Sequence, residues 1–508
     1  MTILPESQGN DNAVQKRFEI FIKRFKINHL LRSVRATKDK GVPAYSIFAF
    51  LMELVFKGKN LYMTLAIGQS KPSFGKDTVY RFLHKAYVQW ERFLFKLSTA
   101  VITEVNRLTS DERKCAFIID DTPYYRNRSK KVEMLSRCFD HSEHKYYKGF
   151  SMLTLGWSDG QTFMPVDFRL LASGKDEHIL CPSQVKTDKR TLATRRRIDA
   201  RKEKPTLMLE MLKNAKGAVA KTKYVLFDSW FASPSSILSV KRFAYDVVAR
   251  LKNHKNYRYL YEGECLSIEQ IYRKNRKRRG LSRFLLSVEI AVRHIDYNET
   301  VPAKLVYVRD KGNRKKWITF VSTDISLSED EIIALYGKRW DIEPYHKVLK
   351  SCLHLTKEFQ LRSFDAITAH TVIVLTRYIF LSLENRENKD ERTMGELFHV
   401  ICDELDDISF NHAFGLIMST IEDCLLEYLH LAKSAVNALV EQFLLHLPDC
   451  IKGRLMVSTW SSRNRCCHRN PSRNRAGAIN AHGSSQVDSG TVSYIYLRKC
   501  GDGIKVET

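Results

Sequence analysis

Apolar residues recur at helical spacing through the first part of the chain. Clusters at residues 18–25, 47–56 and 79–95 fit buried or amphipathic helices, and no alternating strand pattern competes with them. The stretch 73–85 predicts a turn and then a short amphipathic helix that begins with basic and hydroxyl residues. In a helix that reads DNA, Lys76, Thr78 and Arg81 would contact the bases. A packed helix with a solvated basic face explains the same pattern.

Short buried runs replace the helical pattern after residue 114. Residues 115–119 predict a strand that ends at Asp120, and residues 147–157 and 163–171 predict two strands joined by the turn Ser158-Asp159-Gly160. The elements expected next are a helix over 206–215, a strand over 224–227 that delivers Asp228, a helix over 235–242 and a strand over 245–251. The order βββ-α-β-α-β predicts an α/β fold with a ribonuclease-H-like core, in which strand ends hold acids beside a later helix.

More strands are expected between the second acid and that helix. Residues 284–294, 303–309 and 317–321 have strand character, and Asp310-Lys311-Gly312-Asn313 predicts the turn between the last two. The expected division is 1–110, a helical DNA-binding domain; 111–252, the first part of the core; 253–324, a β insertion; 325–366, the last core helix; 367–457, a packed C-terminal helical bundle; and 458–508, a mostly disordered tail rich in Ser, Arg, Asn and Gly.

The charge of the chain favours a polyanionic partner. Lys and Arg number 83 against 57 acids, a balance of +26, and two basic runs at residues 186–204 and 273–279 are candidates for phosphate contacts. No apolar run is judged to approach the ~18 residues of a membrane span, so we expect nucleic acid and no membrane. The N-terminus lacks a secretory pattern, and eleven scattered cysteines fit a reducing compartment. Cys466-Cys467-His468 lacks the spacing of a zinc site.

One further stretch combines helix signals with candidate chemistry. Ser328 followed by three acids predicts a helix start, and at about 100° per residue four later side chains share a stripe about 60° wide. These side chains are Tyr336, Arg339, Glu343 and Lys350. One acid, two cations and a phenol suit a metal-bound phosphate, although a solvated charged face is the commoner reason for such a stripe. Pro344 predicts a kink, because its ring clashes with the carbonyl of Trp340.

Together with Asp120 and Asp228, this stripe resembles the Y-(2)-R-(3)-E-(6)-K signature of the insertion sequence 4 family of bacterial DDE transposases. The resemblance extends over roughly residues 110 to 360. It implies an enzyme that binds the ends of its element as double-stranded DNA, cleaves them and joins the 3′ ends to a target. It also implies Mg²⁺, with Mn²⁺ as a substitute, a homodimer in the synaptic complex, and a bacterial cytoplasmic, nucleoid-associated location.

The resemblance also assigns residue roles. Asp120, Asp228 and Glu343 would hold two divalent ions about 3.5–4 Å apart, and carboxylates are the hard oxygen ligands that Mg²⁺ and Mn²⁺ prefer. Asp120 is preferred to Asp121 because it directly follows the strand, so Asp121 is expected to face away and support a turn. Three residues of the stripe, Tyr336, Arg339 and Lys350, would grip phosphates of the DNA end.

Two tryptophans near the expected site have different interpretations. Trp317 would stack on a base flipped out of the DNA near the cut, although core packing explains a strand tryptophan as well. Trp230, two residues after Asp228, is expected to pack beside the site.

Two other functions fit parts of the pattern. A catalytically inactive relic or repressor would keep DNA affinity, but the complete set of signature residues argues against it. A resolvase or ribonuclease on the same core predicts neither the β insertion nor the stripe of four side chains.

Overall fold

The computed structural model describes residues 13–452, apart from residues 39, 58–60, 68–71, 109–111, 142, 184–187, 189, 220, 279–282, 294–298, 311–312, 314–315, 388–393, 428, 430 and 449–450. The expected tail at 458–508, including Cys466-Cys467-His468, lies outside the described residues. The first part is helical: α1 (Ala13–Arg24), α2 (Ile27–Ser33), α3 (Ala44–Leu54), the 3-10 turn η1 (Val55–Lys57), α4 (Leu61–Ile67), α5 (Lys76–Leu83) and α6 (Trp90–Arg107).

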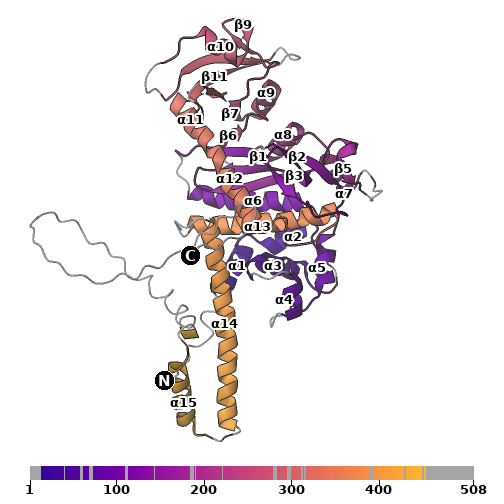
Figure 1. The fold of residues 1–508 in the computed structure, drawn as a ribbon, viewed down its shortest axis with the longest axis vertical. Coiled ribbons are helices and arrows are strands. Elements are labelled where there is room, and N and C mark those ends of the chain that lie inside the picture. Colours follow the sequence, from indigo (N-terminus) through magenta and orange to yellow (C-terminus); the bar gives the residue numbers. More distant parts are fainter. Residues whose placement is uncertain are drawn as a thin grey trace, which may run out of the picture. The chain divides into compact units, whose positions relative to one another are not determined.

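A mixed sheet follows these helices (Figure 1). Its central strands are β1 (Cys115–Tyr125), β3 (Lys145–Ser158), β4 (Phe163–Leu171), β6 (Thr222–Phe227) and β7 (Asp246–Leu251). They lie in the order β4-β3-β1-β6-β7, with β1, β3 and β4 antiparallel and β1, β6 and β7 parallel. Three antiparallel strands followed by two parallel ones fit the expected ribonuclease-H-like nuclease fold.

Two strands beside β3 were not expected from the sequence. β2 (Leu135–Asp140) pairs antiparallel with the first half of β3, and the short β5 (Ile179–Cys181) pairs with β2 at Leu135 and Ser136. Because β2 pairs with this part of the chain, β3 begins at Lys145, two residues before the start that the sequence predicted. A short 3-10 turn, η2 (Asp176–His178), precedes β5.

The strands expected as an insertion continue the same sheet. They are β10 (Leu286–Arg293), β11 (Thr300–Arg309) and β12 (Trp317–Ser322), and the short strands β8 (Tyr259–Tyr261) and β9 (Glu264–Leu266) and the helix α10 (Ile268–Lys274), which were not expected, precede them. β12 pairs antiparallel with β7, so the ladder passes from the central strands to β11 and β10 without a break. Two residues of the expected turn at 310–313, and Arg279 of the basic run, lie outside the described residues.

Helices cover both faces of the central strands. On one face lie α6 and α13 (Phe364–Glu387): Ser98 of α6 donates a 2.6 Å hydrogen bond to the carbonyl of Pro165, and the Phe364 ring lies 5.6 Å from that of Phe150. On the other face lie α8 (Lys204–Ala215) and α9 (Pro234–Arg242). α7 (Leu192–Asp199) precedes α8. The N-terminal helices and the sheet share one hydrophobic core.

The helix α13 corrects one expectation. By length and composition its 24 residues could cross a membrane, whereas no run of that kind was expected. Every residue of its most apolar window is buried inside the protein, as in a core helix. The sequence indicated a buried helix over residues 371–383, interrupted by Arg377, and the buried position of α13 agrees with that interpretation. In the structure Arg377 is fully buried and pairs with Glu358 at 2.7 Å.

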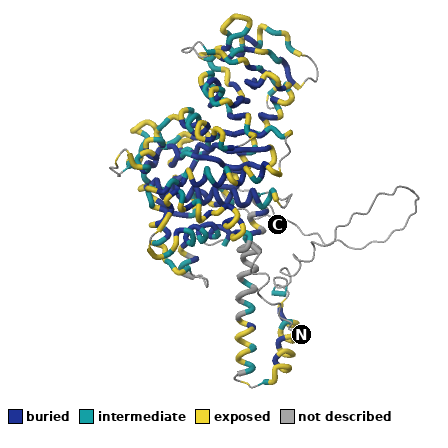
Figure 2. Tube along the Cα trace, turned by 180° about the vertical axis from the view of Figure 1, so that it is seen from behind, coloured by how far each residue is buried: buried dark blue, intermediate teal, exposed yellow. Residues whose placement is uncertain are grey.

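The expected C-terminal bundle is divided. α13 and the first turns of α14 (Met394–Glu427), with Leu397 and Ile401, belong to the main core, whereas the later part of α14 and α15 (Lys433–Leu445) share a small separate cluster around Met418, Val436 and Val440. Figure 2 shows the contrast between the dark-blue buried sheet and the largely yellow α15. The domain boundaries proposed from the sequence stay predictions.

Candidate active site

Two of the three candidate acids stand side by side because of strand register. β1 and β6 are parallel, and Ile119 pairs with Phe227. Asp120 is the next residue of β1 and Asp228 directly follows the end of β6, so the two acids lie beside each other at strands that are spaced about 4.8 Å apart. The prediction that Asp120 ends its strand is wrong. β1 continues to Tyr125 on the β3 side, and only its ladder with β6 stops.

The third acid lies on a helix that is interrupted before it. The predicted helix starts as expected with a capping box between Ser328 and Glu331. It then consists of α11 (Glu329–Gly337), the 3-10 turn η3 (Lys338–Asp341) and α12 (Ile342–Ser351). Pro344 therefore falls in the first turn of α12, where a missing N–H breaks no helical hydrogen bond. The helix is irregular near Pro344, as predicted, but the irregularity is the 3-10 turn η3, which precedes the proline.

Arg339 connects the acids. Its Nη1 lies 3.6 Å from Oδ2 of Asp120, and its Nη2 lies 3.5 Å from Oε1 of Glu343. The guanidinium is buried and lies against the rings of Tyr336 and Trp340, 5.9 and 4.8 Å from their centroids. Its Nε is enclosed and has no hydrogen-bond partner among the described residues.

The electrostatics of Asp120 are unusual for a carboxylate. Burial, together with the negative charges of Asp121 and Asp228, raises its pKa to about 7, and Arg339 offsets only part of this effect. The Asp228 carboxylate accepts a hydrogen bond from the backbone N–H of Trp230. The negative charge of Asp120 and Asp228 is therefore only partly neutralised by the surrounding residues.

Lys350, the last residue of the stripe, also reaches β1. Its Nζ donates a 2.6 Å hydrogen bond to the hydroxyl of Thr122 and lies 5.7 Å from the centre of the Tyr125 ring. Burial lowers the pKa of Lys350 against the raising effect of Asp140 and Asp120. Lys350 and Arg339 therefore lie on the same side of β1, two strand residues apart.

Asp121 points to the opposite face of β1. Its Oδ2 accepts hydrogen bonds of 2.7 Å from Ser151 on β3 and from Lys204 on α8. It faces away from Asp120, as expected, but it supports no turn, since the strand continues through it. The exposed indole of Trp230 lies on this side, 5.1 Å from the Lys204 ammonium.

The carboxylates of Asp120, Asp228 and Glu343 are the type of ligand that a hard divalent cation prefers, but the three side chains do not converge on one point in this structure. Among the described residues no three His, Cys, Asp or Glu side chains converge closely enough to enclose an ion, because Arg339 lies between Asp120 and Glu343. The Glu343 side chain is 50% exposed and can turn. The raised pKa of Asp120 marks the place where a cation would relieve repulsion.

The remaining candidates lie elsewhere. Trp317 begins β12, stacks on Tyr272 at 4.8 Å and meets the Tyr307 ring at 5.1 Å. Phe320, three residues later on the opposite face of β12, is the residue whose ring contacts Tyr336, at 4.6 Å. In α5, Lys76 and Arg81 are exposed and Thr78 is partly exposed.

Sequence analysis missed His346. It lies one turn after Glu343, is buried, and its Nε2 has no hydrogen-bond partner among the described residues. Burial and the positive charges of Lys350 and Arg339 lower its pKa to about 3, so the imidazole is neutral at neutral pH. Its position three residues after Glu343 on the same helix was the signal that could have identified it.

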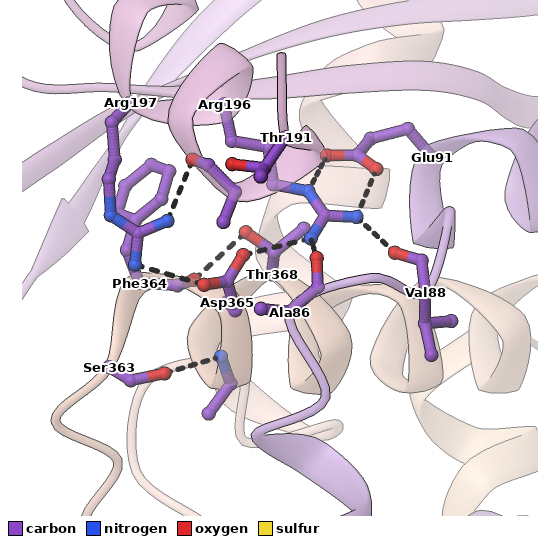
Figure 3. A network of polar contacts seen from close by, with 12 residues as sticks. Ala86, Val88, Glu91, Thr191, Arg196, Arg197, Ser363, Phe364, Asp365 and Thr368 are labelled. Carbon is purple, nitrogen blue, oxygen red and sulfur yellow. Dashed lines mark hydrogen bonds and ion pairs between the residues drawn. The ribbon is translucent and has the colours of Figure 1, made fainter. Parts of the chain in front are cut away.

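The basic run at 186–204 is only partly a surface feature. Figure 3 shows that Arg196 binds Glu91 and Asp365, and that Arg197 binds Asp365 as well. Arg197 also pairs with Glu133 at 2.7 Å. Both arginines are buried, so they hold α6, α7 and α13 together and cannot contact DNA phosphates.

A mixed sheet with neighbouring acids and a later acid-bearing helix defines a nuclease of the ribonuclease-H-like class. Residues 56–314, about half of the 508, match the family model described as DDE superfamily endonuclease, so the chain belongs to that family. The match includes Asp120 and Asp228 and ends before Glu343. No curated protein matches the chain.

Proposed function

We propose that the protein is the transposase of a bacterial insertion sequence. It binds the ends of its element as double-stranded DNA, cleaves them and joins the 3′ ends to a target by a cut-and-paste route. The observation that carries this proposal is the neighbouring pair Asp120 and Asp228, whose surplus negative charge lies beside Arg339 and Glu343. The stripe from Tyr336 to Lys350 supports the narrower assignment to the insertion sequence 4 family.

In this proposal Asp120, Asp228 and Glu343 hold Mg²⁺, with Mn²⁺ as a substitute. Such ions, when bound, activate the attacking oxygen and neutralise charge on the leaving side. Arg339 contacts both Asp120 and Glu343, and its guanidinium supplies a positive charge beside them for a phosphate of the DNA end. Lys350 supplies a second cation on the same side of β1.

Joining two ends requires that both be held at once. We therefore propose a homodimer in the DNA complex, formed in the bacterial cytoplasm at the nucleoid. The mass of the complex with DNA, measured by light scattering, tests the stoichiometry.

A cleavage assay on the DNA that flanks this gene tests the function. Asp120→Ala, Asp228→Ala and Glu343→Ala should each lower Mg²⁺-dependent cleavage at least about a hundredfold and leave DNA binding intact. Asp121→Ala is the matched control and should be milder, because that carboxylate serves Lys204 and Ser151 on the other face. Full cleavage by any of the three variants removes that residue from the site. Wild-type protein that binds DNA without cutting it favours an inactive DNA-binding relic.

A further inference from the structure

The hairpin of β2 and β3 carries an exposed group of two aromatic and two cationic side chains. Phe139 pairs with Tyr146 across the hairpin, and Arg137 pairs with Lys148. The side chains of such pairs share a face, so the four form one surface, here called the hairpin platform. Phe139 is 40% exposed and Tyr146 is 54% exposed, whereas the intervening Tyr147 is buried on the other face.

Contacts within the platform orient the two rings and leave both of them partly exposed. The Phe139 and Tyr146 centroids lie 5.1 Å apart at 68°, and the His141 ring lies 5.0 Å from Phe139. The Arg137 guanidinium lies 4.1 Å from the centre of the Tyr146 ring. Two exposed aromatic rings on an edge strand are a risk for aggregation. The described strand β5 pairs only with Leu135 and Ser136, so it leaves this part of β2 uncovered.

The platform lies on the same face of the sheet as Asp120. Asp120 pairs with Thr154 on β3, and the register of β3 continues unshifted from there to its pairs with β2. Thr154 and Tyr146 are eight residues apart along β3, an even number, so their side chains point to the same side. At about 3.3 Å per residue the platform is about 26 Å from the acids, measured along the strand.

The charge around the platform suits an anionic strand. Besides Arg137 and Lys148, the exposed Arg128 and Lys130 lie on the preceding loop, which Asn127 joins to β3 by accepting a 2.9 Å hydrogen bond from the backbone N–H of Lys148. Glu143 in the hairpin turn is paired with Lys145. Cations that meet phosphates, next to rings on which bases stack, are the combination that single-stranded nucleic acid requires.

We infer that the hairpin platform binds an unpaired stretch of the DNA strand that leaves the active site. This inference rests on the proposed function, because that function supplies DNA on the face of the sheet that bears Asp120. Phe139 and Tyr146 stack on unpaired bases, and Arg137 and Lys148 contact the flanking phosphates. A base-paired duplex offers no free base face, so it gains only the phosphate contacts.

Two fluorescein-labelled probes test the inference on the full chain without divalent metal: a blunt duplex, and the same duplex with a short unpaired thymine tail. Wild-type protein should bind the tailed probe more tightly. Phe139→Ala with Tyr146→Ala should weaken binding of the tailed probe about fivefold or more and leave the blunt duplex within about twofold. Arg137→Gln with Lys148→Gln should weaken both probes and lower the slope of log affinity against log salt.

Phe443→Ala is the matched control, because Phe443 on α15 is 47% exposed and lies far along the chain from the hairpin. Melting temperatures confirm that the variants fold. The inference is overturned if the aromatic variant keeps the preference for the tail, if wild-type protein has none, or if the aromatic variant instead changes the oligomeric state. A wild-type protein that prefers the tail but cuts no DNA with Mg²⁺ or Mn²⁺ contradicts the proposed function and not the platform.

Discussion

The guanidinium of Arg339 and the carboxylate of Asp120 lie 3.6 Å apart, yet the pKa of Asp120 stays near 7. The arginine therefore compensates only part of what burial and the neighbouring acids impose. A residual repulsion at the site has measurable consequences for stability.

We expect Asp120→Asn to stabilise the protein at high pH. The folded-state pKa of about 7 lies above the ordinary value of 3.8, so between these values the folded state binds more protons than the unfolded state, and stability falls as the pH rises. At about pH 8 the variant should gain about 1–4 kcal/mol over wild type in metal-free unfolding, and near pH 4 the difference should vanish. Asp330→Asn is the control, because its exposed carboxylate makes only a surface ion pair with Arg283, so no gain is expected. A pH-independent effect of Asp120→Asn would contradict the assignment.

The same repulsion predicts stabilisation by metal. Mg²⁺ or Mn²⁺ should raise the melting temperature of wild-type protein at about pH 8, because a ligand that binds only the folded state shifts unfolding by mass action. The shift should shrink at about pH 5.5, where protons compete for Asp120. Asp120→Asn should lose most of it. An equal shift in that variant would mean that the ions bind elsewhere.

Arg196 should matter for stability and not for DNA contact. Arg196→Met leaves Glu91 buried without this partner and Asp365 with Arg197 alone, so a loss of about 3–5 kcal/mol is expected in denaturant unfolding. Arg195→Glu, one residue earlier and exposed, should change stability by less than about 0.5 kcal/mol and weaken DNA binding. Normal stability of Arg196→Met would contradict the structural role.

Trp317 should act through packing. Its two ring contacts, at about 0.5–1.5 kcal/mol each, predict that Trp317→Ala loses about 1–3 kcal/mol and that Trp317→Phe recovers part of the loss. DNA nicking should then decline in step with melting temperature. A stable Trp317→Ala protein that nicks normally but is slow in a later strand step would favour the base-stacking role.

The exposed side of α5 should read DNA if this helix recognises the element ends. Lys76→Ala and Arg81→Ala should each weaken binding to those ends more than to unrelated DNA, and each should lower the salt slope by about one. Val79, Phe82 and Leu83 are buried beneath it, so the fold should survive. Lys23→Ala on α1 is the control. If the variants lose the same affinity for all DNA sequences, α5 contacts phosphates only and does not read bases.

Strand pattern predicted the central strands well, and β1 shows where it fails. Asp-Asp-Thr-Pro has poor strand propensity, so the sequence indicated an end at Ile119. Beyond Ile119, no described residue pairs with β1 on the β6 side, so the missing N–H of Pro123 breaks no ladder bond there. The pairing with β3 alone continues the strand to Tyr125.

The parts of the candidate site that follow from local sequence patterns could be predicted. The contacts between residues far apart in the sequence could not. The register that joins Asp120 to Asp228 follows from two apolar runs that each end in an acid. Arg196 gave no comparable signal: it lies in a basic run, and its partners Glu91 and Asp365 are 105 and 169 residues away. Spacing along the chain cannot distinguish such a buried arginine from one that binds phosphate.

Asp365 receives both Arg196 and Arg197, and it comes 169 residues after Arg196 along the chain. The two guanidinium groups lack this shared carboxylate until α13 has left the ribosome. A truncated chain that stops before residue 365 would keep Glu91 for Arg196 and Glu133 for Arg197, but it would place two neighbouring buried guanidinium groups together without the carboxylate that they share. The segment before residue 365 should therefore be less stable alone than in the full chain.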